Sequence, residues 1–125
     1  MNEELVWSQV GEEGFTRLVA AFYRRIHEDN LIGPMYPKED MEGSERRLLQ
    51  FLCFRIGGNT TYLEERGHPR LRGRHMPFAI GEAERDRWLQ LINEAMIETN
   101  VPEESAAWLN KFFTDVADFM RNRKG

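Results

Sequence analysis

The chain has 125 residues, the length of one domain, and it is 41% hydrophobic and 30% charged, so its composition supports a buried core rather than disorder. Its 17 Lys and Arg against 21 Asp and Glu give a formal net charge of −4, which argues against a general nucleic-acid coat. The single cysteine, Cys53, excludes an internal disulfide framework and a cysteine-rich zinc site. No apolar run approaches the ~20 residues of a membrane span, and the acidic start is unlike a secretory signal. We therefore expect one domain over residues 1–125, located in the cytoplasm.

Apolar residues recur at helical spacing along nearly the whole chain. The pattern over residues 15–26 predicts a first amphipathic helix of about four turns. Gly11 and Gly14 separate it from a short leader, and it should end near residues 29–30. Two glycines and two prolines then predict a loop over residues 31–43, with at most one turn of helix.

Ser44 is the expected N-cap of the second helix, which Gly57 and Gly58 should end. That helix is apolar over most of its circumference, which is typical of a helix buried on more than one side. Beyond an irregular stretch, Pro69 and Pro77 bracket a short helix of about two turns.

The remaining sequence predicts two long helices. The first covers residues 81–99, and the second opens at Pro102. The apolar stripe of the second should continue to Phe119 or Met120. No stretch alternates with period two for long enough to form a strand, so the predicted fold class is all-α, with four substantial helices and two short ones.

The three histidines are the first candidates for chemistry. His27 lies beside arginines and His68 lies in a loop, and both fit surface or structural roles. His75 has apolar neighbours at the end of the short helix, where a hydrogen-bonded core histidine is the ordinary interpretation. A zinc site is poorly supported, because Pro69 breaks the helix that would align two histidines. A haem requires only one axial imidazole and an apolar slot from the protein. If His75 is that ligand, a backbone carbonyl around Leu71 would accept a hydrogen bond from its other ring N–H.

A haem slot also needs apolar walls. Several bulky residues stand on segments that can flank a flat ring, although an ordinary helical core is the simpler interpretation of their periodicity alone. These residues are Leu48, Phe51, Leu52, Phe78, Trp88 and Ile92.

Residues 66–75 carry four arginines and no acid. A solvated basic face, a phosphate site and a clamp for the two haem propionates all fit this pattern, because arginine offers carboxylates a fixed fork of donors. Tyr62 would add a hydroxyl donor. Tyr23 falls in the apolar stripe of the first helix, where its hydroxyl would reach either a small ligand, the surface or a backbone carbonyl.

An ordered series of short motifs resembles the truncated haemoglobins of group II. The resemblance runs from about Val10 to Met96 and weakens in the last helix. It implies a shortened globin, with two helices crossed over two, that binds one haem b. The motifs are Phe22-Tyr23, Tyr36-Pro37, Glu45-Arg46-Arg47-Leu48, Gly57-Gly58, Thr61-Tyr62, Arg66-Gly67-His68-Pro69-Arg70-Leu71-Arg72, Arg74-His75, Pro77-Phe78, Glu84-Arg85-Asp86 and Trp88-Leu89.

The resemblance assigns roles to single residues. His75 matches the proximal ligand of the haem iron. Tyr23, Tyr36 and Trp88 match three polar aromatic residues on the distal side, where small ligands bind. Leu48 matches a position above the haem.

Other positions match the family less directly. Ser44 stands where the globin distal histidine would be; relatives often have alanine there, so its hydroxyl would add a donor or hold a water. Gly11-Glu12 replaces the usual Gly-Gly before the first long helix, and Asn59 replaces a common proline. The positions associated with the haem propionates are matched by Arg47, Tyr62 and Arg74.

The function that the resemblance implies is reversible O2 binding at the haem iron, for sequestration or transport. Hydrogen bonds from Tyr23 and Trp88 to a partly charged ligand contribute about 1.5–3 kcal/mol each, so we expect tight ligand retention. NO and CO are further expected ligands. The sequence is also compatible with a homo-oligomer. The alternative is a haem-dependent enzyme acting on nitric oxide or peroxide, which would need a reductase as electron donor. A cofactor-free helical interaction module is the third interpretation.

Overall fold

The computed structural model describes residues 1–58 and 80–121. Within these residues the chain forms helices and no strand, which confirms the predicted all-α class. Short 3-10 turns connect the first two long helices. In chain order the elements are α1 (Glu3–Glu28), η1 (Gly33–Met35), η2 (Lys38–Asp40), α2 (Met41–Gly57), α5 (Glu82–Glu98) and α6 (Glu103–Met120).

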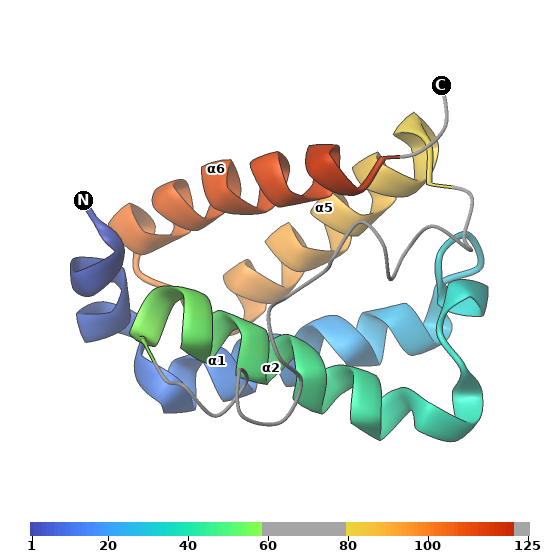
Figure 1. The fold of residues 1–125 in the computed structure, drawn as a ribbon, viewed down its shortest axis with the longest axis horizontal. Coiled ribbons are helices and arrows are strands. Elements are labelled where there is room, and N and C mark those ends of the chain that lie inside the picture. Colours follow the sequence, from blue (N-terminus) through green and yellow to red (C-terminus); the bar gives the residue numbers. More distant parts are fainter. Residues whose placement is uncertain (59–79, 122–125) are drawn as a thin grey trace.

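The four long helices form two layers, with α1 and α2 in one and α5 and α6 in the other (Figure 1). Helix α1 contacts each of the other three long helices, so it holds the two layers together. The fully buried core contains Phe15, Phe22, Leu52, Ile92 and Phe113, which come from all four helices. This is the two-over-two arrangement that the resemblance implies.

Helix α1 is kinked at Gly11, whose φ of 68° and ψ of 174° favour glycine. The leader before the kink is itself helical, and the Asn2 side chain caps it by accepting a hydrogen bond from the Leu5 N–H. The buried Ser105 hydroxyl donates to Gln9 at 2.6 Å, which ties the leader to α6. After the kink the helix continues to Glu28, as the apolar pattern predicts.

The prediction that Ser44 caps α2 is wrong, because the helix begins three residues earlier, at Met41. Gly43 therefore lies inside the helix rather than in the loop. A Cβ at position 43 would meet the Asp40 carboxylate, the end of a side chain that can shift, and the helix continues through this glycine without a break.

The other helix ends match their sequence signals. Gly58 adopts a φ of 73° and closes α2 with its N–H on the last carbonyls. The Glu84 carboxylate accepts the Gly81 N–H at 2.8 Å at the start of α5. On α6 the apolar stripe continues at Met120, which faces a cavity, and not at Phe119, which is 61% exposed.

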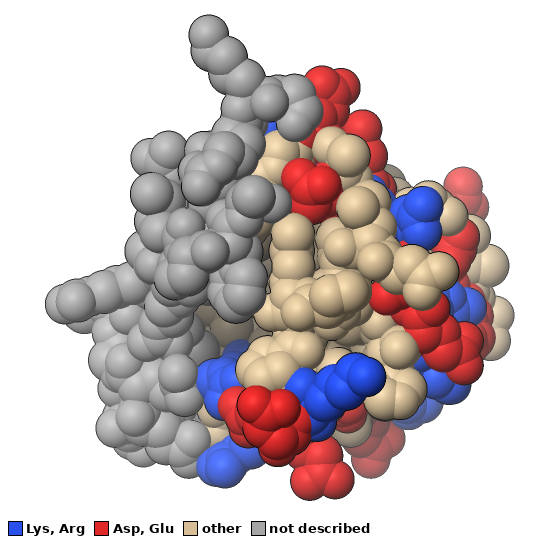
Figure 2. Space-filling model, turned by 90° about the vertical axis from the view of Figure 1, so that its right-hand side faces the viewer, with Lys and Arg blue, Asp and Glu red and all other residues tan. Residues whose placement is uncertain are grey.

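Among the described residues, no helix is long and apolar enough to cross a membrane. The short helix predicted between Pro69 and Pro77 lies outside the described residues. On the side of the molecule shown in Figure 2, acidic and basic side chains are interspersed around a central patch of uncharged residues.

A candidate cofactor pocket between the helix layers

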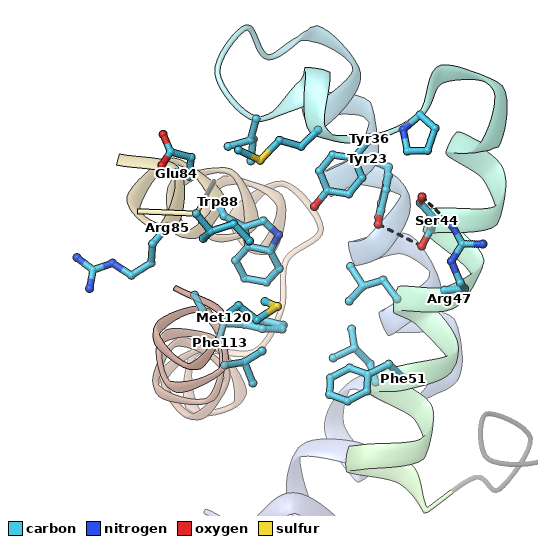
Figure 3. A pocket seen from close by; sticks show the side chains of 18 of the residues that line it. Tyr23, Tyr36, Ser44, Arg47, Phe51, Glu84, Arg85, Trp88, Phe113 and Met120 are labelled. Atoms are coloured by element: carbon cyan, nitrogen blue, oxygen red, sulfur yellow. Dashed lines mark hydrogen bonds between the residues drawn. The ribbon is translucent and has the colours of Figure 1, made fainter. Parts of the chain in front are cut away.

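A cavity of about 460 Å³ lies between the two helix layers. This volume is within the roughly 300–1,000 Å³ typical of ligand and cofactor sites. The lining is mostly apolar, and a few polar groups project into it from separate elements (Figure 3). Its apolar walls include Ile32 and Met35 near η1, Leu48, Phe51 and Leu52 on α2, and Phe112, Phe113, Val116 and Met120 on α6.

Three polar aromatic residues converge on this cavity from segments far apart in the sequence. Tyr23 comes from α1, Tyr36 from the end of η1 and Trp88 from α5 (Figure 3). The rings of Tyr23 and Tyr36 meet edge to face, with centroids 5.6 Å apart. The Trp88 ring packs between Phe22 at 5.1 Å and Phe113 at 5.6 Å. The packing fixes the directions in which their polar ends point.

The Tyr23 hydroxyl donates a hydrogen bond to the backbone carbonyl oxygen of Ser44, 3.1 Å away. Burial raises the pKa of Tyr23 well above its ordinary value, and the neighbouring Tyr36 raises it further. The phenol therefore stays protonated and keeps its donor at neutral pH.

Burial also raises the pKa of Tyr36, to about 12, while the Trp88 indole N–H offsets part of the rise by acting as a donor to the Tyr36 hydroxyl. In Figure 3 the two polar ends point toward each other. A ligand beside them would meet one hydroxyl and one indole N–H in a setting poor in water.

Ser44 and Arg47 form the polar side of the cavity on α2. The Arg47 guanidinium donates to the Ser44 hydroxyl at 3.1 Å and to the Asp40 carboxylate at 2.8 Å. Ser44 is only 9% exposed, so its hydroxyl belongs to the wall and not to the surface. Arg47 thus brings a positive charge to the lining, where it suits an anionic group such as a carboxylate.

A second arginine in the lining, Arg85, is held differently. Its guanidinium pairs with Asp118 at 2.6 Å and with Asp86 at 2.8 Å. The hydrogen bond with Asp118, followed by the one with Asp86, raises its pKa. Figure 3 shows the side chain pointing away from the cavity, so Arg85 braces α5 against α6.

The structure brings together all five residues expected on the ligand side: Tyr23, Tyr36, Ser44, Leu48 and Trp88 line the cavity. Of the expected cofactor contacts, Arg47, Leu48, Phe51 and Leu52 also line it. Ile92 does not line it and is fully buried in the core between the helices. The remaining expected residues, His75, Tyr62, Leu71, Arg74 and Phe78, lie outside the described residues.

Sequence reasoning missed the contribution of α6 and of the loop before α2. Phe112, Val116 and Met120 belong to the apolar stripe of the last helix, which carried no prediction of a site, and they form one wall of the cavity. Ile32 and Met35 stand in a segment that carried no helical pattern. The apolar stripe of α6 was the available signal, but periodicity alone does not distinguish a wall from a core.

The donor set fits a flat, largely apolar group with an anionic edge. Aromatic and aliphatic walls from α2 and α6 face each other across the cavity, and Arg47 brings a positive charge to its lining. This is the chemistry of a porphyrin that carries carboxylate side chains.

Comparisons with known proteins agree with this geometry. The family model of bacterial-like globins matches residues 6–122. The group 2 truncated hemoglobin YjbI of Bacillus subtilis is 37% identical over 103 residues, covering 82% of this chain and 77% of that protein. The crystal structure of a hemoglobin from Chloroflexus aurantiacus is 40% identical with a TM-score of 0.89, covering 94% of this chain and 98% of that one. A truncated oxygen-avid haemoglobin from Bacillus subtilis is 35% identical with a TM-score of 0.88 and the same coverage. The chain therefore belongs to the bacterial-like globins, among the group II truncated haemoglobins.

Proposed function

We propose that the protein binds O2 reversibly at the iron of one haem b per chain, held between the two helix layers. Membership of the globin family implies a haem cofactor. The observation that carries the proposal is the convergence of Tyr23, Tyr36 and Trp88 on an otherwise apolar cavity of suitable size. A related haemoglobin from Bacillus subtilis, described as oxygen-avid, supports O2 as the ligand.

We assign the iron ligand to His75. This assignment rests on its position in the sequence, because residues 59–79 lie outside the described part of the chain. A backbone carbonyl around Leu71 would accept the other ring N–H and fix the neutral tautomer. Tyr62, Arg74 and Phe78 would complete this side of the cofactor, with the first two toward the propionates.

The haem supplies the iron centre at which a diatomic ligand binds, and the chain supplies the surroundings. Leu48, Phe51 and Leu52 from α2 provide an apolar wall that excludes water. Arg47 would neutralise a propionate, and its present partner Asp40 would then share the guanidinium.

The distal donors set how strongly a ligand is retained. The single hydroxyl hydrogen of Tyr23 already serves the Ser44 carbonyl, so it reaches a ligand only by leaving that oxygen. The Trp88 N–H likewise has a partner, the Tyr36 hydroxyl, but that hydroxyl only accepts in this bond, so its own hydrogen can serve a ligand while Trp88 stays beside it. We infer that Trp88 and Tyr36 make the larger contribution to ligand retention, and that Tyr23 mainly shapes the pocket.

The test is reconstitution with hemin followed by absorption spectra of the ferric, ferrous and O2-exposed protein. We expect wild type to form a stable complex with a Soret band, and His75→Ala to retain little haem. His27→Ala is the matched control, because His27 is exposed on α1 and should behave as wild type. Chain that takes up no hemin would contradict the proposal. Catalytic turnover of nitric oxide with an added reductase would instead favour the alternative function, a haem-dependent enzyme acting on nitric oxide.

A further inference from the structure

We propose that the ion pair between Asp29 and Arg87 positions the ligand side of the pocket, by fixing the segment that carries Tyr36 against the helix that carries Trp88. The inference rests on the proposed function, because these two aromatic residues would surround the bound ligand. Asp29 and Arg87 do not line the cavity themselves. They are positioning residues.

The Asp29 carboxylate is the centre of this arrangement. It follows the last residue of α1, and its side chain is only 5% exposed. One oxygen accepts the N–H groups of Leu31 and Ile32, at 3.0 and 2.9 Å. The other oxygen accepts a hydrogen bond from the Arg87 guanidinium at 2.7 Å. Both oxygens are thus used, and each ties Asp29 to a different part of the fold.

The electrostatics keep this carboxylate charged. Burial by itself would raise the pKa of Asp29, but the hydrogen bonds from Ile32, Arg87 and Leu31 outweigh it and hold the pKa below its ordinary value. A buried carboxylate deprived of its cation would be left uncompensated, which is strongly unfavourable. The pair therefore resists separation at neutral pH.

From Asp29, short backbone hydrogen bonds lead directly to Tyr36. Ile32, held by the carboxylate, accepts the Met35 N–H at 3.0 Å, and Gly33 accepts the Tyr36 N–H at 3.0 Å. The loop also packs closely against α1, since a Cβ at Gly33 would lie 2.6 Å from the Ile26 carbonyl oxygen. This tight turn leaves Tyr36 little freedom to move independently of Asp29.

On the other side, Arg87 immediately precedes Trp88 on α5. The ion pair therefore joins the two segments whose aromatic side chains face each other in the cavity (Figure 3). A change of about one ångström between these segments would alter the donor geometry around a small ligand. No contact of Asp29 or Arg87 with the ligand is needed for this effect.

The same two helices carry a second set of ion pairs that serves as a control. Arg24 and Arg25 on α1 pair with Glu98 at the far end of α5. These groups are partly exposed, and none of them lines the pocket. Breaking them should loosen the contact between α1 and α5 without changing the position of Tyr36 or Trp88.

The experiment compares Arg87→Met, the conservative Arg87→Lys and the control Glu98→Gln. The first readout is solvent exchange of the Trp88 indole N–H by NMR, in protein with and without hemin, with the resonance assigned from Trp88→Phe. We expect Arg87→Met to speed exchange roughly threefold to thirtyfold, as for other losses of coupling between sites. Arg87→Lys should restore most of the protection, and Glu98→Gln should match wild type.

The second readout is the C–O stretching band of the ferrous protein with carbon monoxide as probe. Arg87→Met should shift or broaden the band, because the donors around the probe lose their fixed geometry. If Arg87→Met impairs folding, Asp29→Asn replaces it: the amide oxygen still caps Leu31 and Ile32 but loses the charge. Equal effects of Arg87→Met and Glu98→Gln, or none from Arg87→Met or its substitute, would overturn the inference.

The two proposals fail in different ways. A protein that takes up no hemin yet shows faster Trp88 exchange in Arg87→Met would refute the haem function and leave the positioning role intact. A protein that binds hemin normally, with exchange and C–O band unchanged in the variant, would refute only the positioning role.

Discussion

The hydroxyl of Tyr23 on α1 donates to the backbone carbonyl of Ser44 on α2, at 3.1 Å, inside the pocket. This bond joins the two helices of one layer at the place where the ligand would bind. It also fixes the orientation of Ser44, whose own hydroxyl accepts from Arg47. The polar groups around the cavity are therefore linked to each other and not independently mobile.

Tyr23→Phe should lower the free energy of unfolding by about 0.5–1.5 kcal/mol, because one buried hydrogen bond is lost while the Ser44 carbonyl, inside α2, keeps its helical partner. Urea unfolding of the hemin-free protein measures the change. Thr114→Ala is the control, since its hydroxyl donates to a carbonyl on an exposed part of α6 and should contribute little. A variant as stable as wild type would show that this hydrogen bond makes no net contribution to stability.

Stability should fall at alkaline pH because of the two buried tyrosines. In the fold their pKa values lie above the ordinary value of 10, so above pH 10 the unfolded chain has already released protons that the fold retains. Unfolding is then favoured by up to about 1.4 kcal/mol per pH unit for each such tyrosine, and the total is smaller for Tyr36, whose pKa rises only to about 12.

Denaturant unfolding at a series of pH values from 8 to about 12 tests this dependence. The loss for Tyr36 should extend to its pKa of about 12, and that for Tyr23 should continue beyond. The double variant Tyr23→Phe with Tyr36→Phe should have a flatter alkaline limb. Identical limbs in variant and wild type would mean that other groups control the alkaline transition.

Trp88→Phe should speed O2 release about tenfold to a hundredfold, because one hydrogen bond to a partly charged ligand contributes about 1.5–3 kcal/mol. Phenylalanine keeps aromatic packing against Phe22 and Phe113 while it removes the N–H. Stopped-flow displacement of O2 measures the rate. Trp108→Phe is the control, because Trp108 stacks on Phe112 and does not line the cavity. An unchanged rate in Trp88→Phe would exclude the indole as a donor.

Gly11→Ala should destabilise the fold by about 1–3 kcal/mol through backbone strain alone. A Cβ at this position meets nothing within 4 Å, so crowding does not contribute. Gly58→Ala, at a milder left-handed position that is equally open, should have the smaller effect, about 1 kcal/mol. Thermal unfolding of both variants measures the two losses of stability. A larger loss for Gly58→Ala than for Gly11→Ala would contradict the assignment of strain to the α1 kink.

The sequence by itself determined the all-α class, the C-terminal ends of α1 and α2, the extents of α5 and α6, and the family. Those features depend on local spacing and on stop signals such as Gly58, which act within a few residues. It also identified the polar aromatics that line the pocket, because a series of motifs in fixed order carries that information even when no single residue does.

Only the tertiary structure decided which apolar faces become core and which become pocket. Ile92 and Phe112 have the same kind of helical spacing, yet the first is enclosed by other helices and the second faces the cavity. The start of α2 was predicted three residues too late, because Gly43 suggests a break in the chain where the backbone is already helical. The hydrogen bonds of Tyr23 and Asp29 join segments 21 and 58 residues apart, and such pairings exist only once the chain has folded.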